Sequence, residues 1–269
     1  MKETAFTAKG ILNSGIFIYL LCLLIPLLFQ SCSSERMQIK LHASLDGNHI
    51  RYSGPSYPEP SADGEEFGFN LGAMFMGNLN PPGGYGFLNH TGSGNFYAST
   101  DRGPEGFYNN YENNVGKGSS DFMNNLRFMG GIEFASKRSG DDGTTTTLNY
   151  LQVPLYVLYQ TQLPKAGNVF GGLGPYFAYG IGGNTTSTFN NQPSSVKSFD
   201  STTGFKRFDA GLGLTAGYEI SNSFSFRLAY DFGLANIDRN SFGDKAQNRG
   251  ISLNIGYPLD KIIGKSKSH

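Results

Sequence analysis

The sequence predicts an all-β protein: a closed, antiparallel, up-and-down transmembrane β-barrel of eight strands that follows an N-terminal signal segment. Apolar residues recur at every second position in several segments, which is the period of a β-strand. The mean hydropathy of −0.30 is polar, as expected of a barrel whose lipid-facing residues alternate with polar ones. Short and longer connections alternate along the chain, a pattern typical of barrels with periplasmic turns and external loops.

The clearest strand is predicted for residues 148–163, which read LNYLQVPLYVLYQTQL. One face is apolar and aromatic throughout and consists of Leu151, Val153, Leu155, Val157 and Tyr159. The other face includes Gln152, Gln160 and Gln162. The apolar run covers about nine residues, the length that a tilted strand needs to cross a bilayer. The segment therefore predicts a spanning strand with one lipid face and one polar face.

Six further segments show the same alternation: 67–75, 126–135, 169–181, 207–219, 224–234 and 251–257. They bring the strongly patterned strands to seven, whereas a single-chain bacterial barrel has an even number. We therefore expect an eighth strand within residues 78–120, where 107–115 is the best candidate. Residues 37–45 also alternate and are a minor candidate strand.

The connections between these segments differ in length. Residues 161–168 and 220–223 form short connections, whereas 139–147, 183–204 and 238–248 are longer. A Greek-key sandwich has no reason to alternate in this way, so the pattern favours a barrel. Tyrosines near the strand ends on the apolar face are expected to lie at the membrane–water interfaces. They are Tyr159, Tyr179, Tyr218, Tyr230 and Tyr257.

The N-terminus has the three-part layout of a secretory signal, which we expect over residues 1–31. Lys2 and Lys9 precede a continuous apolar run over residues 16–29, and small residues follow it. The run is short for a spanning helix, because such a helix needs about 20 apolar residues. An uncleaved anchor helix is the less favoured alternative.

Two cleavage patterns fit the end of this signal. Residues 29–32, Phe-Gln-Ser-Cys, resemble a lipoprotein cleavage box, after which Cys32 would carry the lipid. Ordinary cleavage after Ser31 or Ser33 fits equally well. Because Cys22 lies inside the signal, the mature chain has no pair of cysteines for an intramolecular disulfide.

Three further regions are expected after the signal. Residues 32–64 are predicted to form a polar linker, because the run SGPSYPEPS at 53–61 is rich in turn residues. The barrel is predicted over residues 65–258, and a basic tail over 259–269.

Several segments also resemble a known family. Residues 150–159, YLQVPLYVLY, resemble the segment YLEIPLLLKY of the porin-like outer-membrane β-barrel proteins common in Bacteroidetes. The resemblance covers residues 65–258 and includes GGLGPYFAYG at 171–180, FDAGLGLTAGYE at 208–219 and the final NIGY. It implies eight strands and the outer membrane of a Gram-negative bacterium. The chain departs from the family pattern at Gln152, where the pattern has an acid, and at Tyr257, the last aromatic, which is not terminal.

Charged residues of both signs fall on the faces predicted to point inward. They are Arg127, Glu133, Arg207, Asp209, Glu219, Arg227 and Asp231. Such charges form either an ion-selective path or a plug of paired side chains, since an isolated buried ion costs several kcal/mol. The interior of an eight-stranded barrel is just wide enough for side chains to fill, so we favour the plug.

Three functional hypotheses follow. The first is a structural or interaction barrel with a plugged interior and external loops that contact a ligand or a protein partner. The second is a small pore for ions or solutes. The third is a lipid-modifying enzyme at the rim that uses His90, Ser93 and Asp101 of the long first loop.

Catalytic, cofactor and nucleic-acid functions have little support in the sequence. The four histidines are not spaced with one another for a metal, so neither a metal nor a cofactor is predicted. The net charge is zero, which gives no support for nucleic acid as a partner. The expected partners are outer-membrane lipid, the barrel assembly machinery and an unidentified protein at the external loops.

Substitution of Cys32 tests the lipoprotein hypothesis. If Cys32 is lipidated, Cys32→Ser abolishes fatty-acid labelling without unfolding the barrel, because its thiol is the attachment point. Mass spectrometry of the mature N-terminus checks this result directly. An unmodified N-terminus at Cys32 or Ser34 would exclude lipidation.

Overall fold

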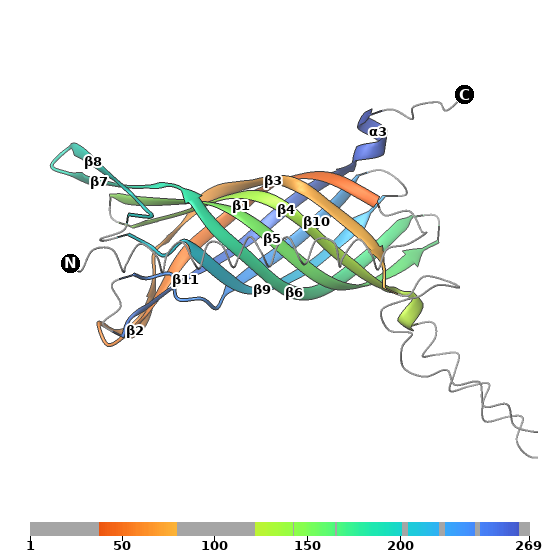
Figure 1. The fold of residues 1–269 in the computed structure, drawn as a ribbon, viewed down its shortest axis with the longest axis horizontal. Coiled ribbons are helices and arrows are strands. Elements are labelled where there is room, and N and C mark those ends of the chain that lie inside the picture. Colours follow the sequence, from red (N-terminus) through yellow and green to blue (C-terminus); the bar gives the residue numbers. More distant parts are fainter. Residues whose placement is uncertain are drawn as a thin grey trace, which may run out of the picture. The chain divides into compact units, whose positions relative to one another are not determined.

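Eight long antiparallel strands close into a barrel within the part of the chain that the computed structural model describes (Figure 1). This part comprises residues 38–79, 122–141, 143–164, 166–200, 204–220, 224–239 and 243–263. The strands are β1 (Gln38–Gly54), β3 (Gly64–Asn78), β4 (Leu126–Asp141), β5 (Thr144–Leu163), β6 (Gly167–Gly182), β9 (Phe208–Glu219), β10 (Ser225–Gly233) and β11 (Lys245–Pro258). Their order is β4-β3-β1-β11-β10-β9-β6-β5, and the pairing of β4 with β5 closes the sheet. The predicted fold class is therefore confirmed.

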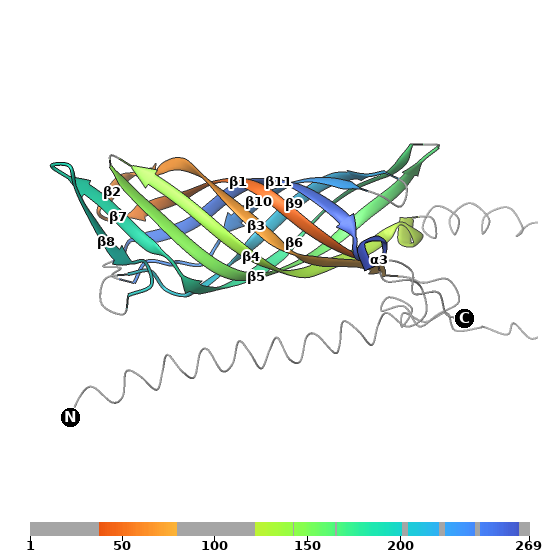
Figure 2. The same cartoon turned by 90° about the horizontal axis from the view of Figure 1, so that it is seen from above.

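The two ends of the barrel differ, and we name them by their connections. The turn end holds the connections 79–125, 164–166 and 220–224, the start of β1 and the end of β11. At the loop end, short strands extend the wall: β2 (Tyr57–Ala62) pairs with β1, and the hairpin β7 (Asn184–Phe189) and β8 (Gln192–Lys197) pairs with β5. Figures 1 and 2 show β2 and β7–β8 at this end, and the short helix α3 (Leu259–Ile263) at the other.

The predicted polar linker over 32–64 is wrong where β1 and β2 lie. β1 pairs with β11 from Lys40 opposite Pro258 to Ser53 opposite Lys245, and it pairs with β3 on its other edge. It is thus the eighth strand of the barrel, which was expected within 78–120. The candidate 107–115 lies outside the described residues.

The physical reason is that β3 and β11 would otherwise leave two open edges in the membrane. The polar residues that make β1 resemble a linker point into the lumen. They are Lys40, His42, Ser44, Asp46 and Asn48, all of which are buried. The alternation in 37–45, which predicts only a minor candidate, is the signal of this strand.

All three of the longer predicted connections also contain strand, and β11 begins at Lys245 within the connection 238–248. β4 and β5 continue through the predicted connection 139–147, with Asp141 opposite Thr144 and a tight turn at Gly143, whose φ is 80°. The predicted loop 183–204 contains β7 and β8. Their turn residues Asn190 and Asn191 have φ values of 50° and 62°, the conformation that a two-residue hairpin turn requires and asparagine tolerates.

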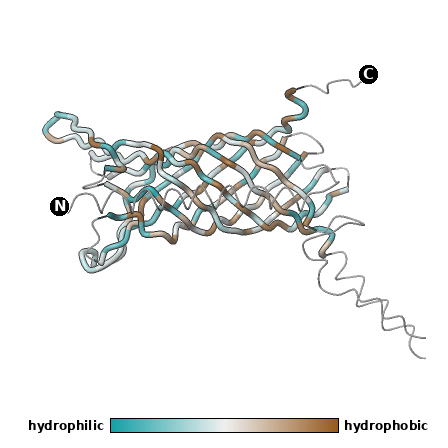
Figure 3. The backbone as a smooth tube through the Cα atoms, in the orientation of Figure 1, coloured by the Kyte–Doolittle hydropathy of each residue, from teal (hydrophilic) through white to brown (hydrophobic). Residues whose placement is uncertain are grey.

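Hydrophobic residues recur between more polar ones along the barrel strands (Figure 3). The large hydrophobic residues that are exposed on these strands form an apolar outer wall. Leu45 is 70% exposed and Leu253 is 58% exposed, although both are large and apolar. A continuous exposed apolar surface of this kind fits lipid rather than water. At the turn end, Phe224 and Tyr257 lie outward with ring centroids 4.9 Å apart, as expected of an interfacial aromatic pair. None of the described helices is long and apolar enough to span a membrane.

The lumen is filled by large side chains that face glycines. Tyr150, Tyr156 and Tyr176 are almost completely buried. A Cβ atom added at Gly213 of β9 would lie 2.7 Å from the Tyr156 hydroxyl oxygen, and one at Gly211 would lie 2.6 Å from the Tyr176 ring. The inward glycines therefore make room for tyrosines from other strands.

Neighbouring positions on β9 test the assignment of its two faces. Leu212→Arg places a charge on the lipid face and should lower the free energy of unfolding by about 2–4 kcal/mol. Thr215→Ser on the lumen face should cost about 1 kcal/mol, because it removes one methyl group and keeps the hydroxyl that donates to the Leu228 carbonyl. Refolding into lipid vesicles across a urea titration measures both values. An equal cost would show that Leu212 does not meet lipid.

Gly213→Ser cannot serve as the mild substitution in this contrast, although Gly213 also lies on the lumen face of β9. The added Cβ would meet the buried Tyr156 ring. We expect a cost of about 1–3 kcal/mol for this overpacking.

The pair Lys40–Glu219 tests the placement of β1. The Lys40 Nζ atom lies 2.8 Å from Glu219 Oε1 on β9, and both side chains are less than 10% exposed. Lys40→Met should lower the free energy of unfolding by about 3–5 kcal/mol, because it leaves a buried carboxylate without its cation. The double variant Lys40→Met/Glu219→Gln should recover part of this loss. A loss for Lys40→Met no larger than that for the exposed control Lys245→Met would contradict the lumenal position of Lys40.

Candidate functional site

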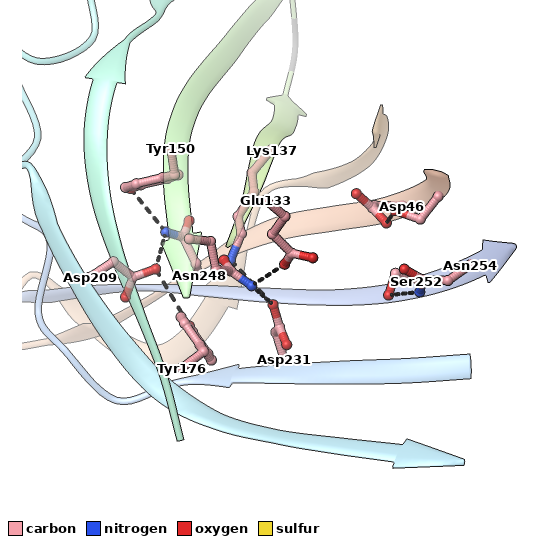
Figure 4. A network of polar contacts seen from close by, with 12 residues as sticks. Asp46, Glu133, Lys137, Tyr150, Tyr176, Asp209, Asp231, Asn248, Ser252 and Asn254 are labelled. Carbon is pink, nitrogen blue, oxygen red and sulfur yellow. Dashed lines mark hydrogen bonds and ion pairs between the residues drawn. The ribbon is translucent and has the colours of Figure 1, made fainter. Parts of the chain in front are cut away.

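A layer of polar side chains crosses the middle of the lumen (Figure 4). Gln152 of β5 donates from its Nε2 atom to Glu133 Oε1 at 2.9 Å and to Asp231 Oδ2 at 3.1 Å. Lys137 of β4 donates to the same Asp231 oxygen at 3.5 Å, and His42 Nε2 of β1 lies 3.4 Å from Glu133 Oε2. We call Glu133, Lys137, Gln152 and Asp231 the central layer. It links β4, β5 and β10, and His42 connects it to β1.

A second layer lies next to it toward the loop end and is built around a buried carboxylate (Figure 4). Asp209 Oδ2 of β9 accepts from Asn248 Nδ2 at 2.8 Å and from the Tyr176 hydroxyl at 3.4 Å. Asn248 also lies 3.1 Å from the Tyr150 hydroxyl, and the Lys137 ammonium lies 4.7 Å from the centre of the Tyr176 ring. We call Tyr150, Tyr176, Asp209 and Asn248 the tyrosine layer. Lys137 joins the two layers electrostatically.

Toward the turn end, Arg227 of β10 anchors a third group of contacts. Its NH2 atom donates to Asn254 Oδ1 at 2.7 Å, and its guanidinium lies 6.0 Å from the centre of the Tyr156 ring. Asn254 in turn donates to the Ser252 hydroxyl at 2.9 Å. Polar contacts therefore continue from the middle of the lumen along β10 and β11.

Most of the charges predicted to face inward lie in the lumen, where they contact other lumenal residues. Four of the seven are buried in the lumen: Glu133, Asp209, Glu219 and Arg227. Asp231 is half-buried and belongs to the central layer. Arg127 is half-buried at the turn end, where its Nε atom donates to Gln160 Oε1 at 3.1 Å. Arg207 lies at the loop end and donates to the Gly180 carbonyl at 2.6 Å.

Sequence reasoning missed two groups of lumenal residues. Lys40, His42 and Asp46 lie on β1, in the segment predicted to be a linker. Ser139 lies on the part of β4 predicted to be a connection, and Lys137 lies between that connection and the predicted strand 126–135, where the alternation continues. The polar alternation of 37–45 could have identified the first group.

Two cavities lie toward opposite ends of the lumen and share no lining residue. The one at the turn end has a volume of about 30 Å³ and lies among Lys40, His42, Phe170 and Arg227. Its volume is enough for about two water molecules. The one at the loop end has a volume of about 500 Å³. The central and tyrosine layers lie between these two sets of residues along the strands.

Other predicted site residues cannot be placed. Cys32, His90, Ser93 and Asp101 lie outside the described residues, so lipidation and the rim-enzyme hypothesis remain predictions. Within the described ranges, no group of three or more His, Cys, Asp or Glu side chains lies close enough together to hold a metal ion.

Comparisons with solved structures find similar proteins over most of this chain. The chain is similar to Ail, the attachment invasion locus protein of Yersinia pestis, with 15% identity, coverage of 83% of this chain and 100% of that chain, and a TM-score of 0.34. Neisserial surface protein A is 11% identical. That match covers 81% of this chain and 96% of that chain, with a TM-score of 0.37. The N-terminal β-barrel domain of Pseudomonas aeruginosa OprF is 10% identical. That match covers 81% of this chain and 99% of the OprF domain, with a TM-score of 0.24. At these identities the likeness concerns the fold alone.

A comparison with protein families identifies the chain more specifically. The model of the outer membrane protein beta-barrel domain matches residues 56–239, which is more than half of the chain. No curated protein matches the chain. The narrower resemblance to Bacteroidetes proteins stays a prediction. The chain belongs to the outer membrane protein beta-barrel domain family, and its location is the outer membrane of a Gram-negative bacterium.

Proposed function

We propose that the barrel is a closed anchor in the outer membrane that does not conduct and that presents its loop end to a ligand or a protein partner. The observation that carries this proposal is the pair of side-chain layers across the lumen. Glu133, Gln152 and Asp231 are joined by hydrogen bonds, and the rings of Tyr150 and Tyr176 fill the space beside them. A solute passing through would have to displace both layers.

The alternative of a small pore has less support. The cavity at the turn end holds about 30 Å³, and its lining includes no residue of the loop-end cavity. A hydrated path for ions would need to break the contact of Lys137 with Asp231 and those of Gln152 with both carboxylates. Breaking buried polar contacts of this kind costs about 1–3 kcal/mol for each group left without a partner.

We assign the loop end to the cell exterior because β2 and the β7–β8 hairpin extend the wall there. Two of the three connections at the turn end, 164–166 and 220–224, are short, as periplasmic turns of bacterial barrels are, whereas the third, 79–125, is longer than such turns. The β2 extension and the β7–β8 hairpin are then exposed to the cell exterior. Insertion by the barrel assembly machinery belongs to the same proposal. The proposed closed anchor has no catalytic role. Lipid turnover that depends on His90 would contradict this proposal.

Planar-bilayer recordings test the plug. The refolded full-length protein should give no sustained conductance steps. The variant Glu133→Ala/Gln152→Ala/Asp231→Ala/Tyr150→Ala/Tyr176→Ala truncates side chains of both layers and should give measurable steps. Glu65→Ala, whose side chain is exposed at the wall, should behave as the wild type. Heat-modifiable migration on gels shows that each sample contains a folded barrel. Sustained open-channel steps from the wild type would refute the plug and favour the pore.

A further inference from the structure

The cavity at the loop end is built from hydroxyl groups on neighbouring strands. Thr144 and Thr146 of β5, Thr185 of β7 and Ser198 just after β8 line its wall, and Tyr52 of β1 lies opposite them on another strand of the barrel. The cavity has a volume of about 500 Å³, within the range of about 300–1,000 Å³ that small-molecule sites occupy.

These hydroxyls form a row whose bonds can be exchanged for bonds to a ligand. The Oγ1 atoms of Thr146 and Thr185 are 3.3 Å apart, and Thr185 Oγ1 lies 3.2 Å from Ser198 Oγ. Ser198 also donates to the Thr147 carbonyl at 2.9 Å, which fixes its position. Each hydroxyl is both a donor and an acceptor and can rotate to suit its partner. A row of this kind matches a ligand that itself carries several adjacent hydroxyls.

The cavity also holds an oriented carboxylate. Asp63 Oδ2 accepts from the Ser139 hydroxyl at 2.9 Å and from the Tyr52 hydroxyl at 3.4 Å. An ionised carboxylate is a pure acceptor, and hydrogen bonds to it are stronger than those between neutral groups. Ser139 is paired with Thr146 across β4 and β5, so Asp63 is placed to accept from ligand hydroxyls beside the hydroxyl row.

Aromatic rings complete the wall with flat apolar surface. The Tyr52 ring stacks on Tyr57 with a centroid separation of 5.5 Å and an interplanar angle of 24°. Phe205 lines the cavity and packs against the buried core beneath it. Rings that combine apolar faces with polar tips suit a ligand that has both C–H faces and hydroxyl edges.

The charge of the lining argues against a strongly anionic ligand. Among the described lining residues, Asp63 and Lys197 carry single charges of opposite sign. Two nearby cations are directed at backbone oxygens, since Lys206 donates to the Asn236 carbonyl at 3.3 Å and Arg239 to the Phe205 carbonyl at 3.3 Å. Recognition of a sulfated or phosphorylated ligand requires a cluster of cations, which this lining does not provide.

We infer that the loop-end cavity binds a neutral saccharide of one or two sugar units. Its hydroxyls bond to the row of Thr146, Thr185 and Ser198 and to the Asp63 carboxylate, and a sugar face packs on the aromatic wall. The inference rests on the proposed function to the extent that the loop end must face the cell exterior. The saccharide then comes either from free sugars or from the polysaccharide of the cell's own outer membrane.

Binding of named sugars to the full-length barrel tests this inference. The protein is refolded in an amine-oxide detergent, because alkyl-glycoside detergents would compete for the site. Saturation-transfer NMR and calorimetry are run with methyl glucoside, methyl galactoside, N-acetylglucosamine and their disaccharides. At least one should bind with a dissociation constant in the millimolar range or lower. Thr185→Val and Asp63→Asn should each weaken binding about three- to tenfold, as expected for one lost hydrogen bond.

Thr188→Val is the matched control, because Thr188 lies on the same strand as Thr185, is exposed and does not line the cavity. It should bind as the wild type does. Heat-modifiable migration confirms that every variant is a folded barrel. Tighter binding of delipidated polysaccharide from the same outer membranes identifies the cell surface as the source, whereas equal or tighter binding of the free disaccharides identifies soluble sugar.

Three outcomes would overturn the inference: no binding of any neutral sugar up to about 10 mM, binding that Thr185→Val and Asp63→Asn leave unchanged, or binding of sulfated oligosaccharides only. None of these outcomes concerns conductance. Failure of the saccharide site is therefore distinguishable from failure of the plug, which the bilayer recordings measure independently.

Discussion

The constraint on which the rest of the structure depends is that every backbone N–H and C=O group in the bilayer must find a partner within the protein. A sheet meets this condition only when it closes, and here closure requires β1 between β3 and β11. β1 lies in a segment whose polar residues suggest a linker, yet closure gives those residues a place in the lumen. Lys40 then meets Glu219 at 2.8 Å, and His42 approaches Glu133 at 3.4 Å. The electrostatics of the interior thus follow from the hydrogen bonding of the wall.

Closure also forces the interior to be packed. With eight strands the lumen is about as wide as its own side chains, so large residues on one strand need small residues opposite. Tyr156 and Tyr176 occupy the space that Gly213 and Gly211 leave free. Buried ion pairs are weak evidence for stability, because the desolvation of two charges offsets most of their attraction. Contacts such as Gln152 with Asp231 connect strands that are not neighbours, and we therefore regard their main effect as specifying one arrangement of the lumen.

The sequence predicts the wall better than the ends or the interior. Strict alternation in 148–163 identifies both faces of β5, and the burial of Gln152 and Tyr156 against the exposure of Val157 agrees with it. β1 is underestimated because its inward face is polar throughout residues 40–48 and because the turn residues at 53–61 follow it directly. Contacts across the lumen could not be predicted, since they depend on the stagger of strands that are far apart in sequence. For the same reason the contact of Lys137 with Asp231, which joins β4 to β10, could not be predicted from the sequence.

The loop end owes its site to strands that are longer than the membrane requires. A spanning strand needs about 9–11 residues, whereas β5 has 20 and β4 has 16. The surplus carries Thr144 and Thr146 beyond the lipid, where β7 adds Thr185 to the same sheet. Side chains on paired strands keep their relative positions better than side chains on irregular loops. The barrel therefore extends its rigid wall into a surface whose hydroxyls are already placed, and the ordering cost of binding a small ligand there is reduced.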